Sequence, residues 1–106
     1  MDNAQKQQLL FTQLVAMFHV AGMQHLGKLK NPLTDKVERD LHAAQETIDI
    51  LDMLKEKTRG NLTPEENRLL GQILQDLKLN YVDEKSRPEP RDTQTAGQGG
   101  EGEKPA

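Results

Sequence analysis

The stretch KEKTRGNLTPEENR, residues 55–68, predicts the end of one helix, a short turn and the start of the next helix. Lys55, Lys57 and Arg59 are basic residues of the kind that stabilise the negative, C-terminal end of a helix dipole. Gly60 suits a left-handed cap after them. Thr63 can cap the following helix, Pro64 suits its first turn, and Glu66 lies three residues after the cap, as in a capping box. This stretch therefore predicts two consecutive helices that meet at a hinge.

A basic turn before a helix also raises the question of phosphate binding, because free backbone amides at a helix N-terminus attract anions. Here Glu65 and Glu66 occupy the first turn, where two carboxylates repel a phosphate. The glycine, lysine and serine or threonine spacing of a P-loop is absent. We interpret the stretch as a structural hinge, and Lys57, Arg59 and Asn61 as the residues of its turn that are candidates for contact with a partner.

Proline and glycine divide the rest of the chain into further helices and a tail. A first helix ends at Gly27, and a loop containing Pro32 follows it. Proline disfavours helical geometry at the residue before it, so Thr34 or Asp35 is the expected cap of the second helix. The expected helices are about residues 4–26, 35–59 and 64–82.

Apolar residues of the second and third predicted helices recur at steps of three and four, which gives each helix one apolar face. No segment alternates apolar and polar residues, and aromatic residues make up 3% of the chain. We predict an all-α fold over residues 1–82, a three-helix antiparallel bundle or a hairpin assembly that a homodimer completes. The apolar faces comprise Val37, Leu41, Ala44, Ile48 and Leu51, and Leu70, Ile73, Leu74, Leu77 and Tyr81.

Residues 83–106 contain no large apolar side chain and are rich in proline, glycine and charge. Such a segment cannot offset its ordering entropy by burial, so we predict a disordered tail. About 80 residues remain to form a core, and a domain of that size gains much from a second chain that shares the burial.

The first predicted helix is apolar around more of its circumference than a monomeric three-helix bundle requires. Two adjacent strips run along it, one through Leu10 and Leu14 and the other through Phe11 and Phe18. We hypothesise that this helix carries a homodimer contact, with Gly22 allowing close approach of the two backbones. The candidate interface residues are Leu10, Phe11, Leu14, Phe18, Gly22 and His25.

Groups that carry chemistry are few. The absence of cysteine excludes disulfides and thiolate sites, and Ser86 in the tail is the single serine. His19 and His25 point about 120° apart on one helix, which disfavours a shared metal ion. The acidic residues Glu46, Asp49, Asp52 and Glu56 drift across a solvated face. We therefore expect no catalytic residue, no metal, no cofactor and no enzymatic activity.

Charge and hydropathy restrict the partners. The net charge is −3 with both signs spread along the chain, which disfavours nucleic acid. An alternative is an RNA- or nucleotide-associated module, provided that the basic turns meet; an antiparallel bundle places them at opposite ends instead. Polar residues interrupt the most apolar window, 9–26, so we expect no membrane span and a cytoplasmic protein. The basic residues that the RNA- or nucleotide-associated alternative would use are Lys28, Lys30, Lys55, Lys57 and Arg59.

The segments HLGKLKNPLT (25–34), AAQETIDILDMLKEKTRGNLTPEENRLL (43–70) and LQDLKLNYV (74–82) resemble the bacterial family called domain of unknown function 1844. The resemblance covers roughly Leu9 to Val82 and is most specific in TIDILDMLKEKTRGNLTPEE. It implies a small bacterial cytoplasmic helical protein with a variable tail and no settled activity. Similar members commonly have an acidic residue where Lys28 stands. Our leading hypothesis is a homodimeric, non-enzymatic protein-interaction or regulatory module with an unknown protein partner.

Overall fold

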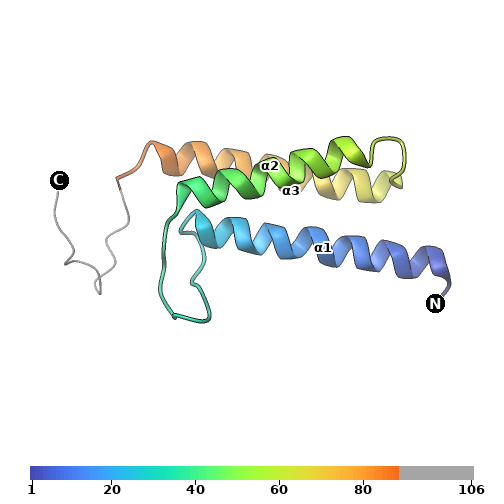
Figure 1. Cartoon of the computed structure of the whole chain (residues 1–106), viewed down its shortest axis with the longest axis horizontal. Helices are drawn as coiled ribbons and strands as arrows, with labels where there is room; N and C mark the ends of the chain where they lie inside the picture. The colour runs from blue at the N-terminus through green and yellow to red at the C-terminus, as the bar shows by residue number, and fades with distance from the viewer. Residues whose placement is uncertain (89–106) are drawn as a thin grey trace.

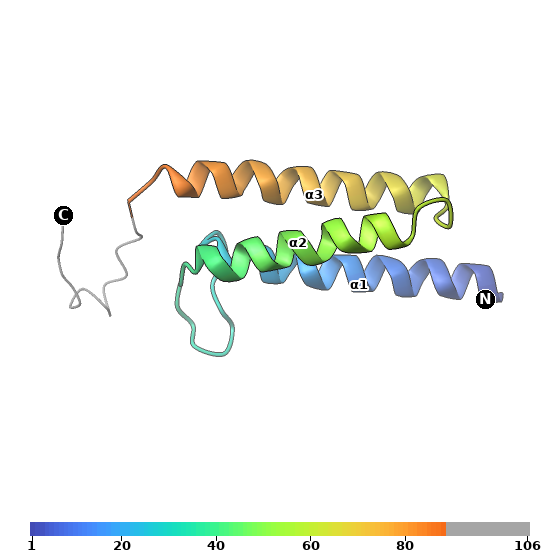
Figure 2. The same cartoon turned by 45° about the horizontal axis from the view of Figure 1, so that its top comes forward.

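A computed structural model describes residues 1–88 of the chain and confirms the all-α fold. It contains the helices α1 (Asn3–His25), α2 (Leu41–Lys57) and α3 (Pro64–Lys85). Figures 1 and 2 show that α2 runs antiparallel to both α1 and α3, and each helix packs against the other two. The part of the predicted tail from residue 89 to residue 106 lies outside the described residues.

Each helix begins at a side-chain cap. Asp2 accepts a hydrogen bond from the Gln5 amide, and Asp40 accepts one from the Ala43 amide. At α3 the predicted capping box is confirmed: Thr63 Oγ1 accepts from the Glu66 amide at 3.1 Å, and Glu66 Oε1 accepts from the Thr63 amide at 2.9 Å. Gly60 has a φ of 77°, the left-handed conformation that glycine adopts without steric cost.

The hydrophobic core lies between the three helices and draws mainly on α2 and α3. Phe11 and Phe18 of α1 pack against this core from positions that remain partly exposed. The buried apolar residues of α2 and α3 come from the predicted apolar faces, although Val37 of the predicted second helix precedes α2. The buried apolar residues are Val15, Leu26, Ala44, Ile48, Leu51, Leu70, Ile73, Leu74 and Leu77.

Gly22 is buried where α1 meets the other two helices. A Cβ atom on Gly22 would lie 2.7 Å from Leu77 Cδ2 of α3 and 3.4 Å from Thr47 Cγ2 of α2. The absence of a side chain therefore permits close packing within one chain. This corrects the prediction that Gly22 serves a contact between two chains.

The second helix begins at Leu41, not at residue 35, and ends at Lys57. The Asn31 carbonyl accepts hydrogen bonds from the amides of Thr34 and Asp35, at 3.2 and 2.7 Å, which closes a turn. Asp35 has a φ of 59°, whereas a helix cap has extended backbone geometry. Asp40, with φ −136° and ψ 92°, takes that role instead.

The third helix continues to Lys85, so the predicted boundary at residue 82 is three residues too early. Asp83 and Glu84, assigned to the tail from their charge, lie in the last turn of α3 and bind basic residues that precede α2. Within residues 1–88, no helix is both long and apolar enough to cross a membrane.

Candidate functional site

One side of α1 is apolar and open to solvent. Leu10, Leu14 and Met17 are 52%, 40% and 68% exposed. At 100° per residue they share a side of α1 with Ala21, about 120° from the core-facing side that holds Gly22. The three-helix core is thus complete without this strip.

The neighbouring side of α2 extends the same apolar surface. Asp52 bonds Lys78 of α3, so it marks the side of α2 that faces α3. Ile50 projects about 160° from Asp52, toward α1, and both Ile50 and Met53 are exposed. Because Thr47 lies beside Gly22 and the helices are antiparallel, these two residues come level with the middle of α1. We call Leu10, Leu14, Met17, Ala21, Ile50 and Met53 the α1–α2 surface.

The distribution of charge sets α1 apart from the other helices. No Asp, Glu, Lys or Arg occurs from Gln7 to Gly27, although these residues make up 29% of the chain. A helix whose outer side is solvated normally carries charge there. Five large apolar side chains of the α1–α2 surface are at least 40% exposed. Large exposed apolar patches mark interaction sites.

The six residues predicted for the interface are divided by the structure. Leu10 and Leu14 lie on the α1–α2 surface, whereas Phe11 and Phe18 pack against the core of their own chain and Gly22 is buried. His25 is partly buried at the end of α1, and its carbonyl accepts the Asp40 amide. Periodicity identified both strips of α1 but not which of them faces the core. The contribution of α2 depends on the register between helices, which periodicity does not give.

The predicted partner-contact turn lies at the end of the bundle where α2 leads into α3. Lys57, Arg59 and Asn61 are exposed; Arg59 forms an ion pair with Glu56 at 2.6 Å, and the Asn61 amide donates to the Thr58 carbonyl. Figure 1 shows this turn at the opposite end of the bundle from the loop between α1 and α2. The basic residues of the two turns therefore do not form one surface, which the alternative of RNA binding required.

An ionic cluster around the buried Glu84 joins the loop between α1 and α2 to the end of α3. Glu84 is 7% exposed and binds Lys28 Nζ through Oε2 at 2.7 Å and Arg39 Nη1 through Oε1 at 3.2 Å. Lys28 also binds Asp83 Oδ2 at 3.1 Å. Arg39 Nη1 donates to the carbonyls of Glu84, Arg87 and Pro88, which satisfies groups left free at the helix end.

Hydrogen bonds from Lys28 lower the pKa of both carboxyls, Glu84 and Asp83, and Arg39 and Arg87 act in the same direction. The same hydrogen bonds, to Glu84 first, raise the pKa of Lys28. Sequence reasoning missed this cluster because its members are separated by the whole length of α2 and α3. The ion pairs and hydrogen bonds of the cluster hold the loop between α1 and α2 against the end of α3.

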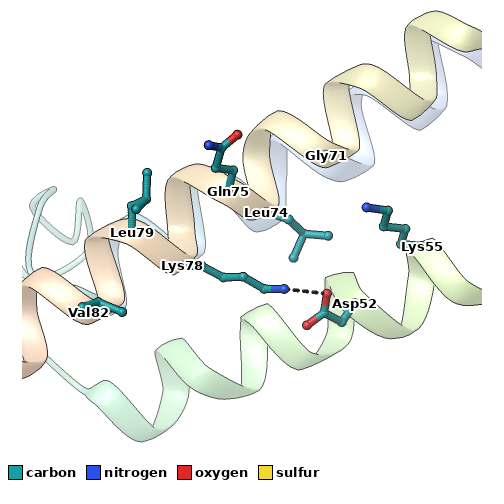
Figure 3. Close-up of a pocket in the computed structure, with 8 residues that line it drawn as sticks. All are labelled: Asp52, Lys55, Gly71, Leu74, Gln75, Lys78, Leu79 and Val82. Carbon is teal, nitrogen blue, oxygen red and sulfur yellow. Dashed lines mark hydrogen bonds and ion pairs between the residues drawn. The ribbon is translucent and has the colours of Figure 1, made fainter.

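An open groove between α2 and α3, with a volume of about 380 Å³, is a further candidate. In Figure 3, Lys78 reaches from α3 to Asp52 on α2, and its Nζ lies 3.1 Å from Asp52 Oδ1. The polar contact across the groove is this exposed ion pair. In the described part of the chain, no three His, Cys, Asp or Glu residues gather in a way that could hold a metal ion. The groove lining comprises Asp52, Lys55, Gly71, Leu74, Gln75, Lys78, Leu79 and Val82.

Comparison with models of protein families matches residues 8–84 to a domain of unknown function (DUF1844). The match includes α2 in full and nearly all of α3, and it begins within α1. No curated protein and no solved structure matches the chain.

Proposed function

The chain belongs to the family of domain of unknown function DUF1844, and we propose that it is a non-enzymatic protein-interaction or regulatory module that forms a homodimer. The α1–α2 surface is the proposed contact between the two copies. The observation that carries the proposal is the exposure of Leu10, Leu14 and Met17 on a helix that has no charged residue from Gln7 to its end.

A homodimer accounts for this surface because a second copy supplies a matching apolar face. In a two-fold contact the same patch is used on both chains, so each exposed side chain is buried against its equivalent region. Burial of apolar area is the main favourable term in association. The surrounding polar residues, such as Gln13 and Gln24, give the patch a polar rim of the kind that interfaces have.

The best catalytic candidate among the described residues has no nucleophile to activate, which supports the absence of enzymatic activity. His19 Nε2 lies 2.8 Å from Asp76 Oδ2 between α1 and α3, and Asn80 donates a hydrogen bond to Asp76 Oδ1 at 3.1 Å. A histidine and carboxylate pair activates a nucleophile such as serine or cysteine. The chain has no cysteine, and its one serine, Ser86, donates its hydroxyl to the Asp83 carbonyl. We assign the pair to helix packing.

Substitution of Met17 by lysine tests the proposed contact. The new charge would lie on the outer side of α1, so the monomer should keep its fold while the dimer is lost. Leu79→Lys is the matched control, because Leu79 is 63% exposed on α3, outside the α1–α2 surface. The measurement is gel filtration at tens of micromolar with circular dichroism. Dissociation of both variants, or of neither, would contradict the assignment of the contact to α1.

The interaction role beyond self-association is tested in the native cell. Crosslinking followed by affinity purification of the full chain and mass spectrometry should recover a specific protein. The amount of that protein recovered with Met17→Lys, compared with the wild-type chain, shows how far its binding depends on the dimer. Repeated recovery of no specific protein would count against the role. Recovery of RNA, with binding that weakens steeply as salt rises, would support the alternative function instead.

A further inference from the structure

We infer that the two copies pack antiparallel, with Leu10 of one α1 level with Ala21 of the other and Leu14 level with Met17. This inference rests on the proposed homodimer and specifies its geometry. The second α1 lies over the α1–α2 surface, so each copy contributes α1 and α2 to a four-helix contact.

The spacing of the apolar strip, which is exposed at Leu10, Leu14 and Met17 and partly buried at Ala21, supports a helix-to-helix seam. Leu10, Leu14, Met17 and Ala21 follow one another at steps of four, three and four, the spacing of two heptads in a coiled coil. Such a strip stays on one side of the helix along its length. Gln7 and Gln24 occupy the next positions at each end, so the apolar seam is closed by polar residues.

Side-chain volume favours the antiparallel direction. A parallel pair would place Ala21 opposite Ala21 and Leu10 opposite Leu10, which leaves one level of the seam underfilled. An antiparallel pair places the small Ala21 opposite the large Leu10 at both ends, with Leu14 and Met17 between them. Packing at the density of protein interiors is therefore more uniform in the antiparallel pair.

The side of α1 on which the strip lies explains why α2 takes part in the dimer contact. The exposed strip of α1 projects toward the side that α2 occupies, so a helix lying on the strip also meets α2. Ile50 and Met53 are the exposed apolar side chains of α2 at that place. By symmetry, α1 of each copy contacts α2 of the other.

Cysteine crosslinking tests the direction, and the natural absence of cysteine makes single substitutions unambiguous. In the antiparallel pair the two Leu10 positions are separated by the helix length from Leu10 to Ala21, about 16 Å. Disulfides require Cα atoms within about 7 Å. Leu10→Cys and Ala21→Cys should therefore form no disulfide separately, but should form a mixed disulfide after they are unfolded and refolded together.

Gln72→Cys, on an exposed position of α3, measures the background from random collision. Disulfides within each single variant, with none between the two, would show a parallel dimer and overturn the inference while leaving the homodimer in place. A dimer by light scattering without any disulfide above background would also overturn it, because the contact would then involve another surface. A monomeric wild-type chain would overturn the proposed function itself.

Discussion

Alanine should stabilise the chain at Gly71 of α3 but not at Gly22 of α1, although both glycines lie in helix interiors. Glycine in a helix interior is about 1 kcal/mol less favourable than alanine, so the backbone gain is the same at both positions. At Gly71 no atom lies within 4 Å of the added Cβ. Gly71→Ala should therefore raise the free energy of unfolding by about 1 kcal/mol.

At Gly22 the added Cβ would lie 2.7 and 3.2 Å from the two methyl carbons of Leu77. Leu77 is fully buried, so its methyl groups have no open space to move into. Overpacking of this kind costs about 1–3 kcal/mol, which offsets or exceeds the backbone gain. The difference between the two variants isolates the steric cost, because the backbone contribution cancels. Gly22→Ala should be less stable than Gly71→Ala by about 1–3 kcal/mol.

Urea unfolding followed by circular dichroism measures both variants, with all chains at one concentration because dimer formation makes stability depend on concentration. Leu77→Val in the Gly22→Ala background removes one carbon near the clash, and it should cost less there than in the wild-type chain. Equal stabilisation by alanine at both glycines would refute the close packing of α1 on α3.

Two other predictions concern the cap of α3 and the ionic cluster. Thr63→Ala should lower the free energy of unfolding by about 1 kcal/mol, and Thr63→Ser by less, in urea titrations; no loss would contradict the role of the cap. Glu84→Gln should cost about 1–3 kcal/mol at pH 7, because Arg39 and Lys28 lose a charged acceptor. The folded-state pKa of Glu84 lies below its ordinary value of 4.5, so the stabilisation is full above that value and is lost as pH falls through the folded-state pKa. The stability difference between wild type and Glu84→Gln should therefore shrink as the pH falls below 4.5 and Glu84 becomes protonated, and a constant difference would contradict the role of the Glu84 carboxylate.

The hinge between α2 and α3 was predictable because its signals are local. Thr63 and Glu66 accept each other's amides, Pro64 has no amide to satisfy, and Gly60 ends the preceding turn. No distant contact is needed to select this structure. The same holds for the apolar faces of α2 and α3, since their periodicity alone determines which side is buried.

The start of α2 was not predictable in this way, because two capping signals compete in LTDKVERDL. Asp35 and Asp40 are both good caps by residue type. The structure selects Asp40, where Arg39 can reach Glu84 and the chain can pair with Leu26. These partners are distant in sequence.

The ionic cluster and the role of Gly22 depend on contacts between helices. Asp83 and Glu84 have the composition of the tail, and they continue α3 where Lys28 and Arg39 approach them. Gly22 was expected to allow a close approach of two chains, and the structure shows it packed against side chains of its own chain. Its neighbours, Leu77 and Thr47, belong to the same chain, and the relative register of three helices was needed to identify them.

The mass of the wild-type chain in solution tests the central claim most directly. Multi-angle light scattering of the full chain at tens of micromolar should give twice the chain mass of 11.9 kDa, and dilution should lower it toward the single mass. Met17→Lys should give the single mass throughout. A wild-type chain that remains at 11.9 kDa at tens of micromolar would contradict the claim that the α1–α2 surface binds a second copy.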